Sequence, residues 1–86
     1  MSDESARGIG WALKQLHNNS RVRRAGWNGM WLYLVTKWSF SASPPPAGWD
    51  AVGMLPFVLM RTADAQVVPW LCSQTDLLAI DWELAE

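Results

Sequence analysis

The chain has 86 residues, of which half are apolar and seven are tryptophan, and its net charge is −1. This length predicts one domain, residues 1–86, without room for a second core. A single cysteine, Cys72, and a single histidine, His17, exclude an intramolecular disulfide and a His/Cys metal site of the usual ligand count. The near-neutral charge provides no long-range field to attract a nucleic acid polymer or an anionic membrane. Oligomerisation is the stabilising device that remains open to so small a domain.

The chain carries no signal for a membrane or for secretion. Its longest apolar stretches, such as residues 30–35, are far shorter than the ~20 residues of a membrane-spanning helix. The acidic N-terminus lacks the apolar segment of a signal peptide. Together with the unpaired cysteine, these features predict a cytoplasmic protein.

The first predicted element is a helix within residues 6–19. Ile9, Leu13 and Leu16 recur there at helical spacing, and the run "HNNS" at 17–20 would end the helix. Three residues before it offer N-cap oxygens: Ser2, Asp3 and Ser5.

Two strands are predicted next, separated by a turn. Residues 21–25 form a short extended segment that is closed by the turn "GWNG". Residues 30–38, "MWLYLVTKW", are rich in aromatic and β-branched residues and predict a longer strand. Both faces of this strand are apolar, with Trp31, Tyr33 and Val35 on one face. We therefore expect burial on both sides, under the helix and against another subunit.

The second half of the chain alternates loops with short elements. Residues 39–53 hold three consecutive prolines and predict a stiffened loop. A further strand follows at 54–62, where Pro56 predicts an edge position or a bulge at its start. The segment "ADAQ" is a tight turn into "VVPW" at 67–70. Ser73 and Asp76 resemble a capping box that opens a short helix over residues 74–79. The segment "DWEL" is a final strand, and the element order predicts an α+β fold with a small antiparallel sheet.

Signals for catalysis are weak. Cys72 has only His17 as a possible base, and a free cysteine is usually a small buried hydrophobe. Asp76 and Asp81 are more typical of caps and surface charges than of an acid/base pair. Glycine-rich phosphate loops, metal-binding spacings and serine elbows are absent from the sequence. We therefore expect a protein that is not an enzyme and that needs no cofactor.

The segment "RVRRAGWNG" combines cations, an aromatic ring and an amide. Arg24 presents a planar fork that matches phosphate oxygens. The face of Trp27 can stack on a base, which is worth about 1–3 kcal/mol in single-strand binders. Asn28 can both donate to and accept from a base edge. The alternative is that Trp27 fills the core while Asn28 only makes a hairpin turn.

The segment "VPWLCSQTD" is a second cluster of the same kind. Trp70 follows a proline, and Gln74, Thr75 and Asp76 line a helix start whose N–H groups can receive an anion or a carbonyl. The alternative is a buried tryptophan beside an ordinary helix cap. Two such clusters without a catalytic set favour a pocket for a nucleotide-like ligand. Most of the other tryptophans are expected in the core or at subunit contacts, and Trp49 is a candidate lid or second-site contact.

These segments carry a family resemblance. The stretches "AGWNGMWLYLV" and "MRTADAQVVPWLCSQTDLLAIDWEL", with the helix before them, resemble the phage Thoeris anti-defence sponge family of the second type. Its members share "K-G-W-N-G" and "K-T-A-D-G-x-x-V-P-W-x-x-S-Q-T-D-x-L-A-x-D-W". Residues 9–85 are covered. The chain departs from the pattern at Arg24-Ala25, in its own 41–53 loop, and at Ala65, which replaces a glycine and strains the turn if its φ is positive.

The resemblance implies a function without catalysis. Members bind cyclic ADP-ribose isomers, such as the glycocyclic form made by bacterial TIR-domain enzymes, and so block Thoeris- or CBASS-type immunity in the cytoplasm of the infected host. Some members also hold cyclic dinucleotides in separate pockets. Members form homotetramers with pockets between subunits. Trp27 and Asn28 match the family's "W-N", and Trp70 and the segment 74–76 match its "P-W…S-Q-T-D".

The residue-level hypothesis joins both clusters in one site. Two rings, Trp27 and Trp70, hold the adenine and ribose, and Arg23 or Arg24 meets the pyrophosphate. Ring and hydroxyl groups of the ligand bond to four polar side chains: Asn28, Gln74, Thr75 and Asp76. Two alternatives remain open, namely a hydrolase of the same signals and an aromatic-platform module that binds carbohydrates or peptides.

Overall fold

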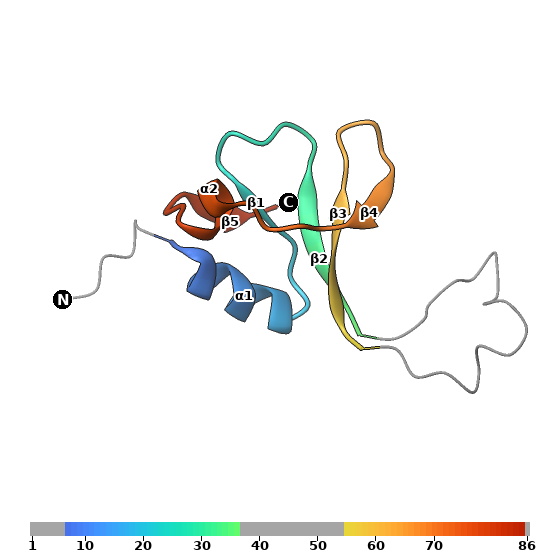
Figure 1. Ribbon diagram of the computed structural model, residues 1–86, viewed down its shortest axis with the longest axis horizontal. Coiled ribbons are helices and arrows are strands. Elements are labelled where there is room, and N and C mark those ends of the chain that lie inside the picture. Colours follow the sequence, from blue (N-terminus) through green and yellow to red (C-terminus); the bar gives the residue numbers. More distant parts are fainter. Residues whose placement is uncertain (1–6, 37–54, 86) are drawn as a thin grey trace, which may run out of the picture.

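The computed structural model describes residues 7–36 and 55–85 (Figure 1). Five strands form one sheet in the order β4-β3-β2-β1-β5, and every neighbouring pair is antiparallel. With two helices, this confirms the predicted α+β fold. The elements, in chain order, are α1 (Ile9–His17), β1 (Val22–Arg24), β2 (Trp31–Val35), β3 (Phe57–Arg61), β4 (Val67–Pro69), α2 (Gln74–Leu77) and β5 (Trp82–Leu84).

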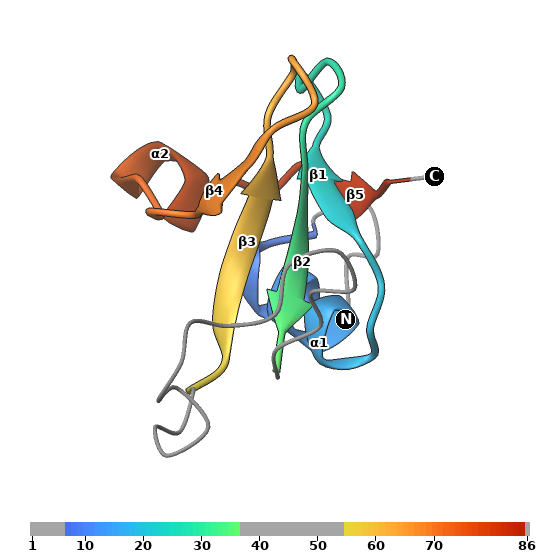
Figure 2. The same cartoon turned by 90° about the vertical axis from the view of Figure 1, so that its right-hand side faces the viewer.

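The sheet is built around the pair of β2 and β3, which run side by side in Figure 2. Their register sets Trp31 opposite Arg61 and Val35 opposite Phe57. The β1 strand pairs with β2 on one side and with β5 on the other, so the end of the chain returns to its beginning. This return places Arg24 of β1 opposite Trp82 of β5.

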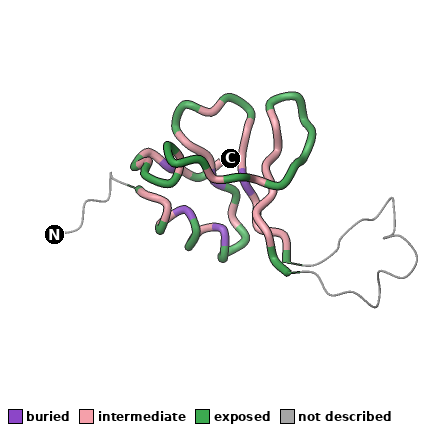
Figure 3. Tube along the Cα trace, in the orientation of Figure 1, coloured by how far each residue is buried: buried purple, intermediate pink, exposed green. Residues whose placement is uncertain are grey.

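The core lies between α1 and one face of the sheet. In Figure 1 both helices lie to the left of β2 and β3, and in Figure 2 α1 lies behind the sheet. A helix buries side chains four positions apart, and a strand buries alternate ones. Within the described ranges, five side chains are therefore almost fully enclosed and form the purple positions of Figure 3: Ala12, Leu16, Val22, Leu32 and Trp82.

The opposite face of the sheet carries half-buried aromatic and aliphatic side chains. Trp31, Tyr33 and Val35 lie there, and the Arg21 guanidinium sits 4.9 Å from the centroid of the Trp31 ring. The prediction that one face of this strand lies under a helix is confirmed by the packing of Leu32. The predicted subunit contact on the other face stays a prediction.

The first helix is shorter than predicted, and its cap is different. The N-cap is Gly8, which makes no side-chain cap hydrogen bond, whereas Ser2, Asp3 and Ser5 lie outside the described residues. The reason is tertiary. Arg7 is held in extended form by two backbone bonds, because its N–H donates to Ile80 and its carbonyl accepts from Trp82. The helix therefore begins only after this bridge.

Two other boundaries differ from the prediction. The second helix ends after Leu77 instead of continuing to residue 79. Pro56 was expected to place the start of this strand at an edge or a bulge; β3 begins only at Phe57, and its first two residues are in register with β2 alone, because β4 pairs only with Leu59–Arg61. The proline precedes the ladder, so its missing N–H costs no strand hydrogen bond. The predicted loop at 41–53, with Trp49, lies outside the described residues.

The turn between β3 and β4 contains a strained residue. Ala65 has φ of 66°, in the left-handed region that favours glycine. The turn is closed by a hydrogen bond of 2.7 Å from the Thr62 N–H to the Gln66 carbonyl. The sequence predicted strain at this turn if φ of Ala65 were positive. It is positive, so the prediction is confirmed.

Candidate functional site

Two of the predicted ligand-binding rings meet at a third tryptophan. The rings of Trp27 and Trp82 have centroids 5.4 Å apart at 77°, and those of Trp70 and Trp82 are 5.9 Å apart at 85°. Both are edge-to-face contacts, an arrangement that aromatic pairs prefer. Trp82 is buried, whereas Trp27 and Trp70 are half-buried at the margin of the core. Each of the two outer rings thus packs on the core and keeps part of its surface accessible.

The turn that carries Trp27 and Asn28 is fixed by backbone contacts. The Trp27 N–H donates to the Arg24 carbonyl at 3.0 Å. Gly29 has φ of 82°, and its carbonyl accepts a hydrogen bond from Arg61. The positive φ requires glycine there, which explains the "N-G" pair in the turn. Asn28 is exposed at the tip.

The second cluster is organised by the start of α2. The Ser73 hydroxyl accepts a hydrogen bond of 3.1 Å from the Asp76 backbone N–H, so the predicted N-cap is confirmed. The Asp76 carboxylate is bound to Arg24. Gln74 and Thr75 are exposed between these anchored residues.

Arg24 joins three segments of the chain. Its Nε and Nη2 donate to the two oxygens of Asp81 at 2.8 and 3.3 Å, and its Nη1 donates to Asp76 at 3.0 Å. The hydrogen bonds to Asp81 and then to Asp76 raise the pKa of the Arg24 guanidinium. The bond from Arg24 lowers the pKa of the Asp81 carboxyl below its ordinary value. The guanidinium that was predicted to meet pyrophosphate is therefore already engaged with two carboxylates.

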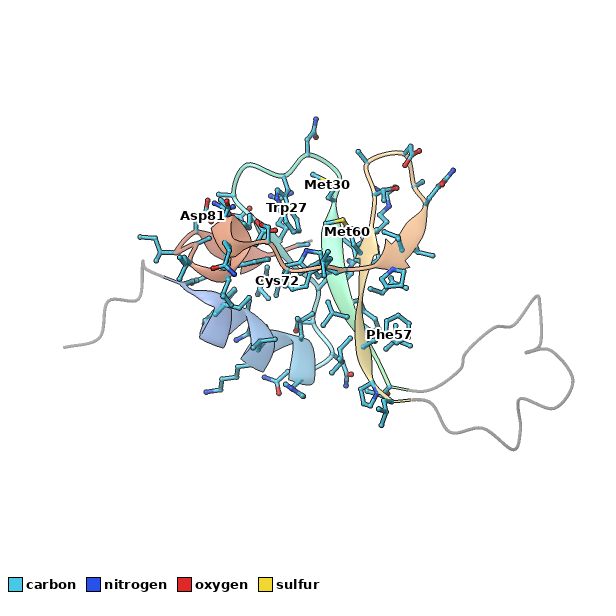
Figure 4. The ribbon with its side chains drawn as sticks, in the orientation of Figure 1. Trp27, Met30, Phe57, Met60, Cys72 and Asp81 are labelled. Carbon is cyan, nitrogen blue, oxygen red and sulfur yellow. The ribbon has the colours of Figure 1, made fainter. Side chains whose placement is uncertain are left out.

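An open depression of about 530 Å³ lies beside α2, a volume in the range of small-molecule sites. It brings together three of the seven predicted site residues, Arg24, Gln74 and Thr75. The remaining four, namely Trp27, Asn28, Trp70 and Asp76, do not line it. Figure 4 shows Trp27 and Asp81 on the same side of the molecule as α2. The other lining residues were not predicted: Leu78, Ala79, Ile80 and Asp81.

Asp81 is the polar residue of this wall that the sequence reasoning missed. Asp81 was weighed only as half of an acid/base pair with Asp76. In the structure both carboxylates accept hydrogen bonds from Arg24. The signal that could have found Asp81 is its place in the "D-W" of the recognised motif.

The Cys72 thiol has the Ser73 carbonyl, not His17, as its hydrogen-bond partner. Burial, followed by the charge of Asp76, raises the pKa of the Cys72 thiol, which disfavours the reactive thiolate. The Cys72 Sγ lies 3.5 Å from the Ser73 carbonyl oxygen, whereas His17 is the last residue of α1. Among residues 7–36 and 55–85, no three His, Cys, Asp or Glu side chains gather as a metal site would require.

The described part of the chain contains no helix with the length and apolar character needed to cross a bilayer. Among the described residues, nine large hydrophobic side chains are nevertheless exposed; one of them, Leu77, lies in α2, and three more are near it: Leu71, Leu78 and Ile80.

Comparison with known proteins agrees with the resemblance found in the motifs. Residues 8–85 match the family described as the Thoeris anti-defense 2-like domain. Over 81 residues the chain is 36% identical to the protein Thoeris anti-defense 2 of Bacillus phage SP01, an alignment that covers 88% of this chain and 91% of that protein. The chain therefore belongs to the Thoeris anti-defense 2-like family.

Proposed function

We propose that this protein is a phage anti-defence protein that captures cyclic ADP-ribose-type immune signals and holds them without cleaving them. Family membership supports the anti-defence role. The observation that carries the capture mechanism is the meeting of Trp27 and Trp70 around Trp82, together with the depression along α2 that Gln74 and Thr75 line. The ligands would be the glycocyclic and related isomers made by TIR-domain enzymes, and cyclic dinucleotides would occupy a second pocket.

The proposed contacts follow the chemistry of the ligand. The accessible surfaces of Trp27 and Trp70 take the adenine, and each stacked ring contributes about 1–3 kcal/mol. Asn28, Gln74 and Thr75 are exposed and can both donate to and accept from ring and hydroxyl groups. Arg24 and Asp76 complete the site behind them.

Capture at low signal concentration needs more than one chain offers. Nanomolar affinity corresponds to about −12 kcal/mol, which exceeds what two stacked rings supply. An open depression also leaves ligand charges in water, where each contact is weaker. The apolar surface near α2 supports closure by another copy, because Leu71, Leu78 and Ile80 are 91%, 74% and 65% exposed. We therefore propose a homotetramer, in the cytoplasm of the infected host, whose pockets lie between subunits.

Titration calorimetry tests the ligand class. The protein is titrated with cyclic ADP-ribose isomers, cyclic dinucleotides and simple sugars, and the bound sample is then denatured. Recovery of intact cyclic nucleotide supports capture. A linear product would establish a hydrolase, and binding of sugars alone would establish an aromatic-platform module. Native mass spectrometry of the same samples reports the number of subunits and of bound ligands.

Substitution of the rings tests the site. Trp27→Leu and Trp70→Leu keep an apolar side chain against Trp82 but remove the flat face. Each is expected to weaken capture by about 10- to 100-fold. Trp11→Leu is the matched control. Trp11 is also half-buried, but its ring faces Arg7, whose guanidinium carbon lies 4.8 Å from the ring centroid. Equal losses in all three variants would refute the assignment.

A further inference from the structure

The α2 helix is too short to hold its own position. It spans four residues, Gln74–Leu77, and none of them is buried. An isolated helix of this length is unstable in water, because few hydrogen bonds repay its nucleation. The side chains of α2 also bury little apolar surface, so packing contributes little to its position. The orientation of Gln74 and Thr75 must therefore come from polar contacts made by their neighbours.

Asp76 provides these contacts with all three of its polar groups. Its backbone N–H donates to the Ser73 hydroxyl at 3.1 Å. Its backbone carbonyl accepts from the Trp82 indole Nε1 at 3.2 Å. Its carboxylate accepts from Arg24 at 3.0 Å. Asp76 is thus hydrogen-bonded to the cap residue, to a core tryptophan and to β1. These bonds also fix the backbone of Gln74 and Thr75, the two exposed residues before it.

Arg24 is in turn fixed by Asp81. Asp81 lies just before β5, and Arg24 is on the paired strand β1, opposite Trp82. The two-point contact of Asp81 with Nε and Nη2 sets the plane of the guanidinium, and this plane directs Nη1 toward Asp76. The pairing of β1 with β5 therefore determines the position of α2, because the Arg24 side chain connects the two strands to Asp76.

The local charge opposes a direct phosphate contact at Arg24. One guanidinium faces two carboxylates, so the three side chains carry a net charge of about −1 at neutral pH. A pyrophosphate brought to Arg24 would approach Asp76 and Asp81 as well, and like charges a few ångströms apart repel. The partial burial of the Arg24–Asp76 pair, whose side chains are 22% and 15% exposed, reduces the screening of this repulsion.

We infer that Arg24 and Asp81 are positioning residues, which hold Asp76 and thereby orient Gln74 and Thr75 for the ligand. This assignment rests on the proposed capture function. It places the ligand phosphates away from the Arg24 cluster and gives Asp81 a role in affinity.

The direction in which Asp81→Asn changes the ligand affinity distinguishes the two roles of Arg24, positioning of α2 and direct contact with phosphate. If Arg24 positions α2, Asp81→Asn weakens binding of a cyclic ADP-ribose isomer by about tenfold, because the guanidinium loses its two-point anchor. If Arg24 instead binds phosphate, Asp81→Asn removes a competing negative charge, and binding stays equal or tightens. The latter result would overturn the inference. Arg24→Lys is expected to resemble Asp81→Asn, since an ammonium cannot reproduce the planar fork.

A ligand-free measurement keeps the test independent of the proposed function. The Trp82 indole N–H donates to Asp76, so its hydrogen exchange reports whether α2 is in place. Arg24→Gln and Asp81→Asn should each speed this exchange by about tenfold. The matched control is Arg23→Gln, because Arg23 lies on the same strand and pairs with Glu83 at 2.7 Å. Unchanged exchange in the Arg24 and Asp81 variants would overturn the inference, even if no nucleotide binds.

Salt provides a third readout. A direct phosphate contact makes the dissociation constant rise with salt, and its removal flattens that dependence. Under the positioning role, Arg24→Gln lowers the affinity but leaves the slope of its salt dependence unchanged. A flattened slope would assign Arg24 to phosphate. Should Arg24→Gln fail to fold, Asp81→Asn carries both the exchange and the affinity tests.

Discussion

Two regions of this small protein are held together by different interactions. The core side, formed by α1 and the buried residues Ala12, Leu16, Val22 and Leu32, depends on apolar burial. The α2 corner, residues 70–81, depends on a cap, a guanidinium and an edge-on ring contact. The core side therefore sets whether the chain folds. The α2 corner, with its exposed polar groups, sets what the folded chain binds.

Trp82 connects the two regions. Its ring is buried against the core side, and its indole N–H donates to Asp76 in the α2 corner. We therefore expect the core side to determine stability and the α2 corner to determine ligand affinity. Mutation can test this, because a change in one region should leave the quantity set by the other region unaltered. Three substitutions and one change of pH, from the largest expected effect to the smallest, probe these regions and the turn outside them.

Leu32→Ala should have the largest effect on stability. Leu32 is 0% exposed in β2, and truncation of such a residue costs about 3 kcal/mol in lost burial and cavity formation. Urea unfolding followed by tryptophan fluorescence measures the loss. The ligand affinity of the protein that remains folded should be unchanged. A parallel fall in affinity would show that the two regions are not independent.

Ser73→Ala should act mainly on the α2 corner. Loss of an N-cap hydroxyl typically costs about 1 kcal/mol, and here that cost falls on a four-residue helix. We expect about a fivefold loss of ligand affinity by calorimetry, with a smaller change in the unfolding midpoint. Ser20→Ala, next to α1, is the control and should leave the affinity unaltered. A loss of stability without a loss of affinity would contradict the role of the cap.

Ala65→Gly should stabilise the sheet without touching either region. Because Ala65 has φ of 66°, glycine removes backbone strain, and the gain is about 0.5–1 kcal/mol after the added freedom of the unfolded chain is deducted. Asn19→Gly is the matched control at φ of 65°, and its gain should be smaller because asparagine tolerates this conformation. Thermal unfolding compares the two. An equal gain at both positions would show that alanine is not specially strained here.

Acid should weaken the α2 corner through Asp81, with the smallest effect of the four. The pKa of this carboxyl is lower in the folded than in the unfolded chain, chiefly because of its bond to Arg24. Ionised Asp81 therefore stabilises the folded state above its ordinary pKa of about 3.9, and this stabilisation is lost as the pH falls through the folded-state pKa. The Asp81 side chain is 41% exposed, so water screens the effect. Urea midpoints of the wild type and Asp81→Asn should differ at pH 7 and converge as the pH falls through the folded-state pKa.

Local signals in the sequence predicted several features of both regions. The stiff, β-branched and aromatic run around Leu32 predicted a strand, and β2 formed there. The Ser73 hydroxyl three residues before the Asp76 N–H predicted a cap, because that bond needs only helical backbone geometry. The match of Trp27 and Trp70 to motif positions identified the family, which the comparisons confirmed.

Other features depended on contacts between distant segments. The Gly8 cap exists because Arg7 is bridged to the beginning of β5, an interaction that no helix-start signal contains. The later start of β3, at Phe57, and its pairing with β4 from Leu59 onward likewise depend on contacts between distant strands. Leu78 and Ile80 entered the wall of the depression because α2 ended early and the chain turned toward β5.

The sequence by itself determined the fold class, the main strand, the Ser73 cap and the family, since these follow from periodicity, local hydrogen bonding and motif spacing. Only the tertiary structure decided that Trp27 and Trp70 both rest on Trp82, and that Arg24 bonds Asp81 before it can meet any ligand. Those pairings depend on the register between β1 and β5, whose residues are far apart in the chain. Register of this kind results from the packing of the whole sheet, so no short stretch of sequence encodes it.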